Sequence, residues 1–318
     1  LLKKYGYHIG LDSFTIMDSA DQEKLIHDIV KQNSTGKINS KQMVYHISNA
    51  KNALATGDQY YLFEYDTNMQ EILVKYEGAK KFSKCLDFDD LIIKTVELFN
   101  KSEFVAQHQA NIQHILVDEY QDTSVLQHKL LKQMSLLADK LNISSVCVVG
   151  DEDQSIYSWR GATVDNILQF PREFPNVQTI KIEQNYRSAS SILETANLLI
   201  KNNHNRNPKN LWSDKTANNR VLIAHTVSGY QEGDLIAQIA SLQHENNSLK
   251  SIAVLYRTHF QSRVIEEALL KQSIPYKIIG GIQFYERKEI KDLLAYLKLI
   301  VNKHDRISFS RVYNCPPR

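Results

Sequence analysis

The spacing of apolar residues predicts helices throughout residues 16–110. Ile26, Ile29 and Val30 lie three to four residues apart after Asp18, whose side chain suits the N-terminal cap of a helix. Similar spacing marks three further runs, which contain Met43, Val44 and Ile47, then Ile72, Leu73 and Tyr76, and then Phe88, Leu91 and Ile92. We therefore expect a mostly helical block in the first third of the chain.

Short apolar runs alternate with helical stretches from residue 112 onward. Residues 115–117 and 146–149 are continuously apolar, and acidic residues follow each run closely. Because fully apolar strands connected by helices are typical of a buried parallel sheet, we expect an α/β unit here. Further runs predict a second α/β unit, with strands at residues 177–182, 221–226, 252–256 and 276–279 and helices starting near Ser188, Gln231, Gln261 and Glu286.

The composition is that of a globular protein rather than of a disordered or fibrous one. The 318 residues are 42% apolar and 23% charged, which is enough chain for about two domains. No run approaches the roughly 18 apolar residues of a membrane helix, so we expect a soluble, cytoplasmic protein. Cys85, Cys147 and Cys315 lie far apart without a Cys-x-x-Cys pair, which predicts buried thiols rather than disulfides or a zinc site.

The net charge of +2 conceals two halves of opposite sign. Residues 1–159 hold 16 lysines, no arginine and 22 acidic residues, a balance of −6, whereas residues 160–318 hold 11 lysines, 11 arginines and 14 acidic residues, a balance of +8. Because a guanidinium fork suits phosphate oxygens, this asymmetry favours contact between the second half and phosphates. Lineage-biased usage of lysine and arginine on solvated faces explains the charges equally well.

An acidic cluster, Asp-Glu-Tyr-Gln-Asp at residues 118–122, directly follows the predicted strand 115–117. Side chains at the carboxyl end of a parallel strand open into the crevice where α/β proteins bind ligands. There, one carboxylate can hold Mg²⁺ beside a nucleotide while its neighbour accepts a proton from an attacking water. The alternative is a structural role, in which the acids favour the first turn of a helix at residues 123–138 through its dipole.

A second cluster, Gly-Asp-Glu-Asp-Gln-Ser-Ile-Tyr-Ser-Trp-Arg-Gly-Ala, occupies residues 150–162 after the other predicted strand. It combines an amide, Tyr157, Trp159 and Arg160 with flanking glycines. Exposed aromatic rings stack on unpaired bases, with about 1–3 kcal/mol per base, so this mixture favours contact with single-stranded nucleic acid. The alternative makes Trp159 an ordinary core residue.

A third cluster, Glu-Gln-Asn-Tyr-Arg-Ser at residues 183–188, joins a predicted strand to a predicted helix. Arg187 at such a junction is placed to reach a phosphate across a cleft, as arginine fingers do. Tyr186 beside it is placed to stack on a base. The alternative makes Arg187 a surface ion pair and Tyr186 a core aromatic residue.

The three clusters, in this order and spacing, closely resemble the motifs of the UvrD/Rep/PcrA branch of superfamily 1 DNA helicases. Residues 86–92 and 284–292 resemble further stretches of the family, so the likeness covers essentially the whole chain. It implies an α/β fold with partial RecA-like parallel-sheet motor domains, 1A and 2A, and a helical 1B subdomain. The implied boundaries are 1–14 for the end of the first 1A segment, 15–85 for 1B, 86–181 for the remainder of 1A and 182–318 for the first part of 2A up to the 2B junction.

The resemblance also implies roles in ATP hydrolysis, with ATP and Mg²⁺ as cofactors. Asp118 and Glu119 would form the metal site, and Glu119 would also activate the hydrolytic water. Gln154 would sense the γ-phosphate and couple it to DNA. Nucleotide contacts are implied for Gln121, for Tyr186 on adenine, and for Arg187 on the γ-phosphate as a catalytic residue.

The implied partner is single-stranded DNA, together with duplex and single-strand junctions. The resemblance places the strand-contacting surface at Tyr157, Trp159, Arg160 and Arg257. It implies an ATP-dependent helicase that translocates 3′ to 5′ and is associated with the nucleoid. Two alternatives stay open: a non-enzymatic single-stranded-DNA-binding module, and a fragment of an AddA/RecB-type helicase–nuclease.

The phosphate-binding loop of the family is missing from this sequence. A P-loop needs a glycine, four residues and then Gly-Lys-Ser/Thr. The only Gly-Lys pair, Gly36-Lys37, is followed by Ile38, and Lys31 stands where the first glycine would be. We therefore expect an internal fragment of a helicase, without the P-loop and the last motor motifs, that hydrolyses no ATP alone.

Overall fold

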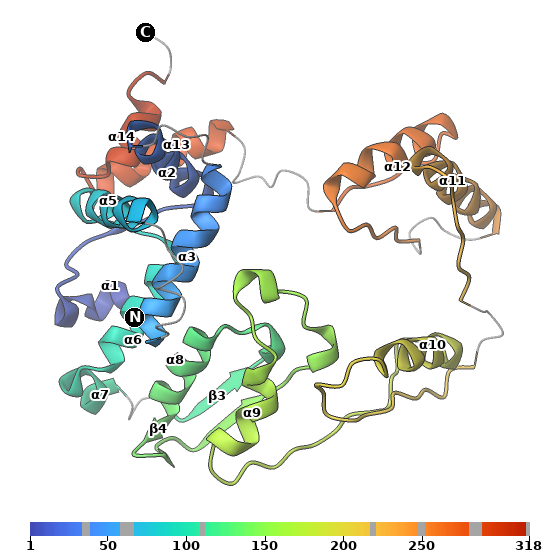
Figure 1. Cartoon of the computed structure of the whole chain (residues 1–318), viewed down its shortest axis with the longest axis horizontal. Coiled ribbons are helices and arrows are strands. Elements are labelled where there is room, and N and C mark those ends of the chain that lie inside the picture. The colour runs from blue at the N-terminus through green and yellow to red at the C-terminus, as the bar shows by residue number, and fades with distance from the viewer. Residues whose placement is uncertain are drawn as a thin grey trace. The chain divides into compact units, whose positions relative to one another are not determined.

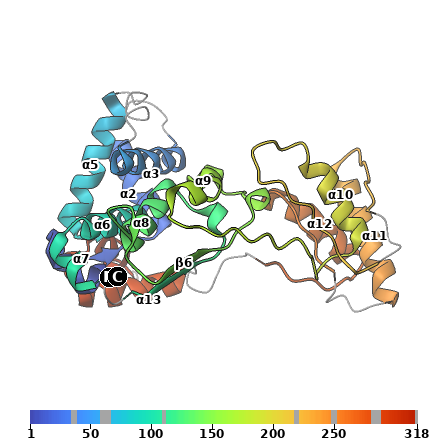
Figure 2. The same cartoon turned by 90° about the horizontal axis from the view of Figure 1, so that it is seen from below.

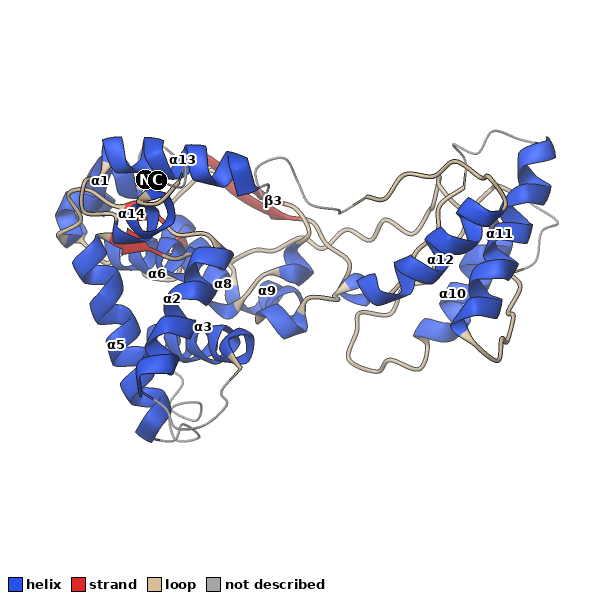
Figure 3. Cartoon of the chain, turned by 90° about the horizontal axis from the view of Figure 1, so that it is seen from above, coloured by secondary structure: helices blue, strands red, loops and turns tan. Residues whose placement is uncertain are grey.

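The computed structural model describes residues 1–33, 39–57, 67–108, 112–216, 221–246, 252–279 and 288–315. The chain divides into two compact units (Figure 1). The first unit comprises Leu1–Gln184, Asn197–Leu211 and Lys288–Arg318, and the second comprises Asn185–Ala196 and Trp212–Arg287. Helices make up most of the regular structure, and the strands are short (Figure 3).

The described elements have the following bounds. The α-helices of the first unit are α1 (Leu2–Tyr5), α2 (Ser19–Asn33), α3 (Ser40–Thr56), α5 (Thr67–Ser83), α6 (Phe88–Phe99), α7 (Ser102–His108), α8 (Val125–Ser135), α9 (Asp165–Glu173), α13 (Lys288–Val301) and α14 (Arg306–Val312). Its strands are β1 (Thr15–Ile16), β2 (Cys85–Leu86), β3 (His114–Val117), β4 (Leu136–Leu137), β5 (Lys140–Leu141) and β6 (Ser145–Val148). Short 3-10 helices are η1 (Gly6–Ile9), η3 (Tyr120–Asp122), η4 (Glu152–Gln154) and η5 (Ser158–Arg160). Helix α10 (Ser190–Ile200) begins in the second unit, which also contains α11 (Gly229–Asn246) and α12 (His259–Lys271).

The helices predicted between residues 16 and 110 are confirmed in the described part of this region. Helix α2 begins after Asp18, whose Oδ1 accepts the backbone N–H groups of Ala20 and Asp21 at 2.9 and 2.8 Å. Helices α3 and α5 both pack against α2 (Figures 1 and 2). Their apolar stripes form one core, which contains Ile26, Ile29, Val30, Met43, Ile47, Ile72 and Tyr76.

A buried ionic cluster of Lys51, Lys80, Asp87 and Asp90 joins α3 and α5 to the start of α6. Lys51 lies 2.6 Å from Asp87 and 2.7 Å from Asp90, and Lys80 lies 3.0 and 2.6 Å from the same carboxylates. Asp87 also caps α6 in a reciprocal capping box with Asp90. Burial alone would raise the pKa of Asp87, but the two ammonium groups outweigh burial and hold this pKa well below its usual value.

Helices α13 and α14 pack within the first unit. Lys291 of α13 lies 3.1 Å from Asp18, and the Lys298 ammonium donates to a backbone carbonyl of β1 at 3.3 Å. These contacts tie the last described helices to the first strand and to the start of α2. The contacts thus group residues 288–315 with the first unit. The domain boundaries that the resemblance implies, with residues 182–318 in one domain, stay a prediction.

The two apolar runs after residue 112 form the predicted parallel pair, β3 with β6. The register places Ile115 opposite Val146, and this face packs against α8 and α9. Leu116 points to the opposite face and is 78% exposed, and its partner Cys147 is exposed as well. The expectations of a fully buried sheet and of a buried thiol at Cys147 are wrong, because both helices cover the same face.

The helices predicted near Ser188, Gln231, Gln261 and Glu286 are confirmed as α10, α11, α12 and α13. In the second unit, α11 and α12 pack against each other. Their shared core consists of Ala237, Ala240, Ile265, Ala268, Leu269 and Ile274.

Within the described residues, the second predicted sheet is not formed. None of the four segments, all of them described, belongs to a β-ladder: 177–182, 221–226, 252–256 and 276–279. Leu222 and Leu255 in two of them are 88% and 94% exposed. An apolar run marks a segment that suits a sheet, but a strand becomes stable only where neighbouring strands pair with it.

Lys80→Met is expected to destabilise the first unit by about 3 kcal/mol, because it leaves two buried carboxylates with one ammonium group. Lys81→Met, at the exposed next position of α5, is the matched control and should change stability by less than about 0.5 kcal/mol. Urea unfolding at pH 7 measures both variants.

The difference between Lys80→Met and the wild type should narrow below about pH 4. The stability that depends on ionised Asp87 is present above the carboxyl pKa of the unfolded chain, about 3.9. This stability is lost as the pH falls toward the lower pKa that Asp87 has in the folded protein. Equal stability of Lys80→Met and Lys81→Met at pH 7 would contradict the role of the ionic cluster.

Candidate functional site

Two loops meet at the carboxyl ends of β3 and β6, as the sequence predicts. The first loop contains residues 118–122, and the second contains residues 150–162. Val149 N–H donates to Val117 O at 2.8 Å, and Tyr120 N–H donates to Val149 O at 3.0 Å. The hydrogen-bonded pairing thus continues past the strand ends and holds the two loops together at one edge of the sheet.

Asp118 and Glu119 are both exposed at this edge. Glu119 has a φ of 49°, in the left-handed region that non-glycine residues rarely adopt. The Asp118 carboxylate accepts the Glu119 N–H at 2.9 Å, and Glu119 Oε2 accepts Gln121 Nε2 at 2.7 Å. Hydrogen bonds on both sides therefore maintain an unusual backbone conformation, a combination that is common at functional sites.

Gln121 lies inside the protein instead of facing a ligand. It is 1% exposed, its Nε2 donates to Glu119, and its Oε1 accepts the backbone N–H of Asp151 at 3.0 Å. The expected nucleotide contact does not fit this geometry, because the nitrogen and the oxygen of the side-chain amide both form hydrogen bonds with protein groups. The amide instead connects Glu119 to the second loop.

Gly150 is required at the start of the second loop by close packing around Gln121. An added Cβ would lie 2.5 Å from Gln121 Oε1 and 2.9 Å from the Ile167 side chain. Any larger residue at position 150 would therefore displace the amide that connects the loops.

Further hydrogen bonds fasten the far ends of the two loops. Asn166 Nδ2 donates to the backbone carbonyls of Thr123 and Ser124 at 2.9 and 3.1 Å. Ser124 also forms an isolated β-bridge with Ala162. The second loop is thus fixed to the first at its beginning and at its end.

The Gln154 side chain is exposed and oriented by Asp151. Its Nε2 donates to Asp151 Oδ2 at 2.6 Å. Burial alone would raise the pKa of Asp151, but hydrogen bonds from Lys209 and Gln154 outweigh it and keep this pKa below its usual value. Asp151 is therefore an anion that holds the amide of Gln154.

Tyr157, Trp159 and Arg160 form an exposed aromatic and cationic surface on the second loop. Trp159 is 53% exposed and Tyr157 is 37% exposed, so Trp159 is not a core residue. The Arg160 guanidinium lies 4.5 Å from the centre of the Trp159 ring and 5.2 Å from that of the Tyr157 ring. Rings and stacked cations of this kind suit unpaired bases.

The remaining candidates, Tyr186, Arg187 and Arg257, belong to the second unit and are exposed. Asn185 Oδ1 accepts the backbone N–H groups of Arg187 and Ser188 at 2.9 and 2.7 Å, which shapes a tight turn before α10. Tyr186 is 71% exposed, which overturns the alternative of a core aromatic residue. The structure thus gathers the candidates of the first unit at one edge, and these three belong to the other unit.

The acidic pair of the first loop fits a hard divalent cation. Two exposed carboxylates supply the oxygen ligands that Mg²⁺ prefers, and such an ion completes its shell with waters and phosphate oxygens. Within the described ranges, Glu77 and the two aspartates of the ionic cluster also approach within 4.8 Å of one another. The lysines of that cluster already neutralise its carboxylates, so it does not suit a metal.

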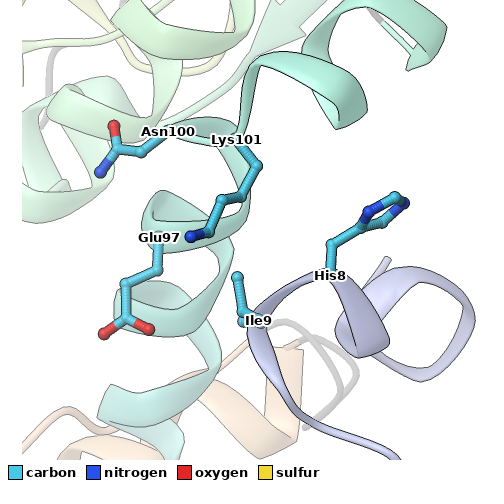
Figure 4. Close-up of a pocket in the computed structure, with 5 residues that line it drawn as sticks. All are labelled: His8, Ile9, Glu97, Asn100 and Lys101. Carbon is cyan, nitrogen blue, oxygen red and sulfur yellow. The ribbon is translucent and has the colours of Figure 1, made fainter.

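Two hollows of the first unit lie apart from Asp118 and Glu119. A groove of about 1140 Å³ runs along β6, α9 and residues 177–183. A hollow of about 450 Å³ lies between η1 and the end of α6 (Figure 4), and it is lined by His8, Ile9, Glu97, Asn100 and Lys101. Neither hollow is lined by the candidate carboxylates, but residues 150–152 of the second loop line the larger groove. None of the helices described here is long and apolar enough to cross a membrane.

Sequence reasoning missed two cations beside the second loop, Arg206 and Lys209. Both form ion pairs with carboxylates of residues 151–153. Neither residue belongs to the clusters that predicted function. The only signal in the sequence is the concentration of positive charge in the second half of the chain.

The fold and site define an α/β protein with acidic and amide-bearing loops at the ends of parallel strands. The second of these loops also carries an exposed aromatic surface. Comparison with protein families agrees with this class. The UvrD/REP helicase N-terminal domain matches residues 1–175, and the UvrD-like helicase C-terminal domain matches residues 180–318. The chain therefore belongs to the UvrD/REP helicase family.

Among curated proteins, the chain is 43% identical over 327 residues to the ATP-dependent DNA helicase PcrA of Bacillus subtilis (strain 168). It is 41% and 40% identical over 326 residues to the proteins of the same name from Staphylococcus aureus (strain Mu50) and Staphylococcus epidermidis. Each alignment covers 100% of this chain and 44% of the relative, so the chain spans less than half the length of these relatives. The AddA/RecB-type alternative is not favoured, because these relatives carry the helicase name alone.

Gly150→Ala is expected to destabilise the first unit by about 1–3 kcal/mol, because the new methyl group overlaps Gln121 Oε1. Gly78→Ala is the control: it lies in α5 with nothing within 4 Å of an added Cβ, and it should stabilise by about 0.5–1 kcal/mol. Urea unfolding measures both. Wild-type stability of Gly150→Ala would show that the loops do not need this close packing.

Proposed function

We propose that the protein to which this chain belongs is an ATP-dependent DNA helicase that translocates 3′ to 5′ along single-stranded DNA. The observation that carries the proposal is the placement of an acidic pair, an exposed amide and an aromatic surface on two fastened loops. Gln154 and Tyr157 lie on the same short loop, so a group that senses phosphate and a surface that stacks on bases move together. The names of the relatives support both ATP and DNA as ligands.

At the ATP site, Asp118 and Glu119 would hold Mg²⁺, which would neutralise charge on the phosphate oxygens. One oxygen of Glu119 accepts a hydrogen bond from Gln121, and in our proposal the carboxylate takes the proton of the attacking water. Gln154 contacts the γ-phosphate. Gln121 acts by orienting Glu119 rather than by touching the nucleotide.

The second unit supplies the other nucleotide contacts in this proposal. Tyr186 stacks on adenine, and Arg187 stabilises charge on the γ-phosphate. Arg257 joins Tyr157, Trp159 and Arg160 in contacting the DNA strand at junctions of duplex and single strand.

Glu119→Gln in the full-length protein is expected to lower DNA-stimulated ATP hydrolysis at least about 100-fold and to abolish unwinding, because the amide keeps the shape of glutamate but accepts no proton. ATP binding should persist. Asp139→Asn, at an exposed acid in the β4–β5 turn, is the control. Steady-state hydrolysis and equilibrium binding of a fluorescent ATP analogue measure the two effects.

Loss of nucleotide binding in Glu119→Gln would contradict the assignment of Glu119 as the base.

The 318-residue chain alone is the second comparison in this experiment. It contains no Gly-x-x-x-x-Gly-Lys-Ser/Thr sequence, so we propose that it hydrolyses no ATP. Robust DNA-stimulated hydrolysis by the purified chain would overturn that proposal.

The names of the relatives do not favour the alternative of a non-enzymatic binding module. The exposed ring of Trp159 supports the contact with single-stranded DNA that we propose for the helicase. Trp159→Ala in the 318-residue chain is then expected to weaken binding about 5- to 150-fold, since one stacked base contributes about 1–3 kcal/mol. Trp212→Ala, at the other tryptophan, 47% exposed, is the control. Anisotropy of a labelled oligonucleotide across a salt series measures the affinity. Equal losses in the two variants would contradict a specific role of Trp159.

A further inference from the structure

Two basic residues of the segment 202–211 form ion pairs with the start of the second loop. We call Arg206 and Lys209 the basic pair, and residues 151–153 (Asp-Glu-Asp) the acidic triplet. The Arg206 guanidinium donates from Nε and Nη2 to the two oxygens of Asp153, at 2.8 and 2.6 Å. Lys209 Nζ lies 2.6, 3.0 and 3.3 Å from the three carboxylates of the triplet in order.

The ion pairs are shielded from water. The side chains of the basic pair are 11% and 15% exposed, and those of the acidic triplet are 25%, 6% and 13% exposed. Three adjacent carboxylates repel one another, and with this little water around them the repulsion is weakly screened. The basic pair therefore decides whether the triplet keeps its conformation.

Asp151 connects the ion pairs to the residues of the proposed ATP site through hydrogen bonds. Its Oδ1 accepts Lys209 Nζ at 2.6 Å, and its Oδ2 accepts Gln154 Nε2 at 2.6 Å. Its backbone N–H donates to Gln121 Oε1 at 3.0 Å, and Gln121 donates in turn to Glu119 at 2.7 Å. A continuous chain of hydrogen bonds thus runs from Lys209 to both Gln154 and Glu119.

We propose that Arg206 and Lys209 are positioning residues for ATP hydrolysis, which hold the acidic triplet so that Gln154 and Glu119 are set in place before the nucleotide arrives. This inference rests on the proposed function of the site. Neither side chain needs to touch the nucleotide, because both act through the triplet. The basic pair should therefore affect the rate of the chemical step and not the affinity for ATP.

Lys209→Met in the full-length protein tests the proposal. We expect kcat of DNA-stimulated ATP hydrolysis to fall on the order of 10-fold, as when an outer partner of a site ligand is removed, with KM for ATP within about 2-fold of the wild type. Lys209→Arg keeps the charge and should recover most of the rate. Lys201→Met, at an exposed lysine shortly before the segment, is the matched control and should behave like the wild type.

A charge exchange tests the other ion pair and guards against a variant that fails to fold. Arg206→Glu should lower kcat, and Arg206→Glu combined with Asp153→Arg should restore it, because the exchange rebuilds the pair with reversed signs. Wild-type kcat in Lys209→Met, or a loss in Arg206→Glu that the exchange does not reduce, would overturn the proposal. A wild-type protein without ATPase activity would instead contradict the proposed function.

Trp159 reports on the loop without any nucleotide. In a Trp212→Phe background of the 318-residue chain, Lys209→Met should raise the acrylamide quenching of Trp159 fluorescence, and Lys201→Met should not. This measurement remains informative if the ATPase assay fails. Identical quenching in Lys209→Met and Lys201→Met would show that the basic pair does not hold the second loop.

Discussion

The parallel pairing of β3 with β6 is the constraint on which the candidate site depends. Its register aligns Val117 with Val148, so the two loops leave the sheet at the same edge. Close contact there is possible because Gly150 has no side chain, which leaves room for the amide of Gln121 between the loops. A single buried amide then connects Glu119 to the backbone of Asp151. Shifting one strand against the other would separate the acidic pair from the loop that carries Gln154.

Much of the first unit was predictable from sequence because its signals are local. Helix spacing located α2 and α6, and the capping chemistry of Asp18 predicted where α2 begins. The second sheet was not predictable in the same way, since an apolar run indicates that a segment suits a sheet but says nothing of its partner. The exposure of one face of β3 was not predictable for a similar reason. Leu116 is apolar, but the sequence does not say that α8 and α9 both pack on the other face.

The site shows the same division between local and distant information. The acidic pair, Gln154 and Trp159 lie in contiguous motifs, so their chemistry was visible in the sequence. The inward orientation of Gln121 was not, because it depends on a backbone N–H thirty residues further along the chain. The ion pair between Arg206 and Asp153 joins residues 53 positions apart, in a segment without periodic pattern. Contacts of this kind become visible only when the fold brings the segments together.

These contacts also change how the charge asymmetry of the chain should be interpreted. The excess of arginine in the second half favoured phosphate contacts, but Arg206 and Arg311 form ion pairs at 2.6 and 2.8 Å with Asp153 and Asp292 of their own unit. An arginine that is paired with a carboxylate of its own unit adds little to the attraction for a nucleic acid. Arg160 differs, since it is exposed and stacked on Trp159. Whether an arginine meets a phosphate is therefore decided by its own neighbours, and the net charge of the region around it is a poor guide.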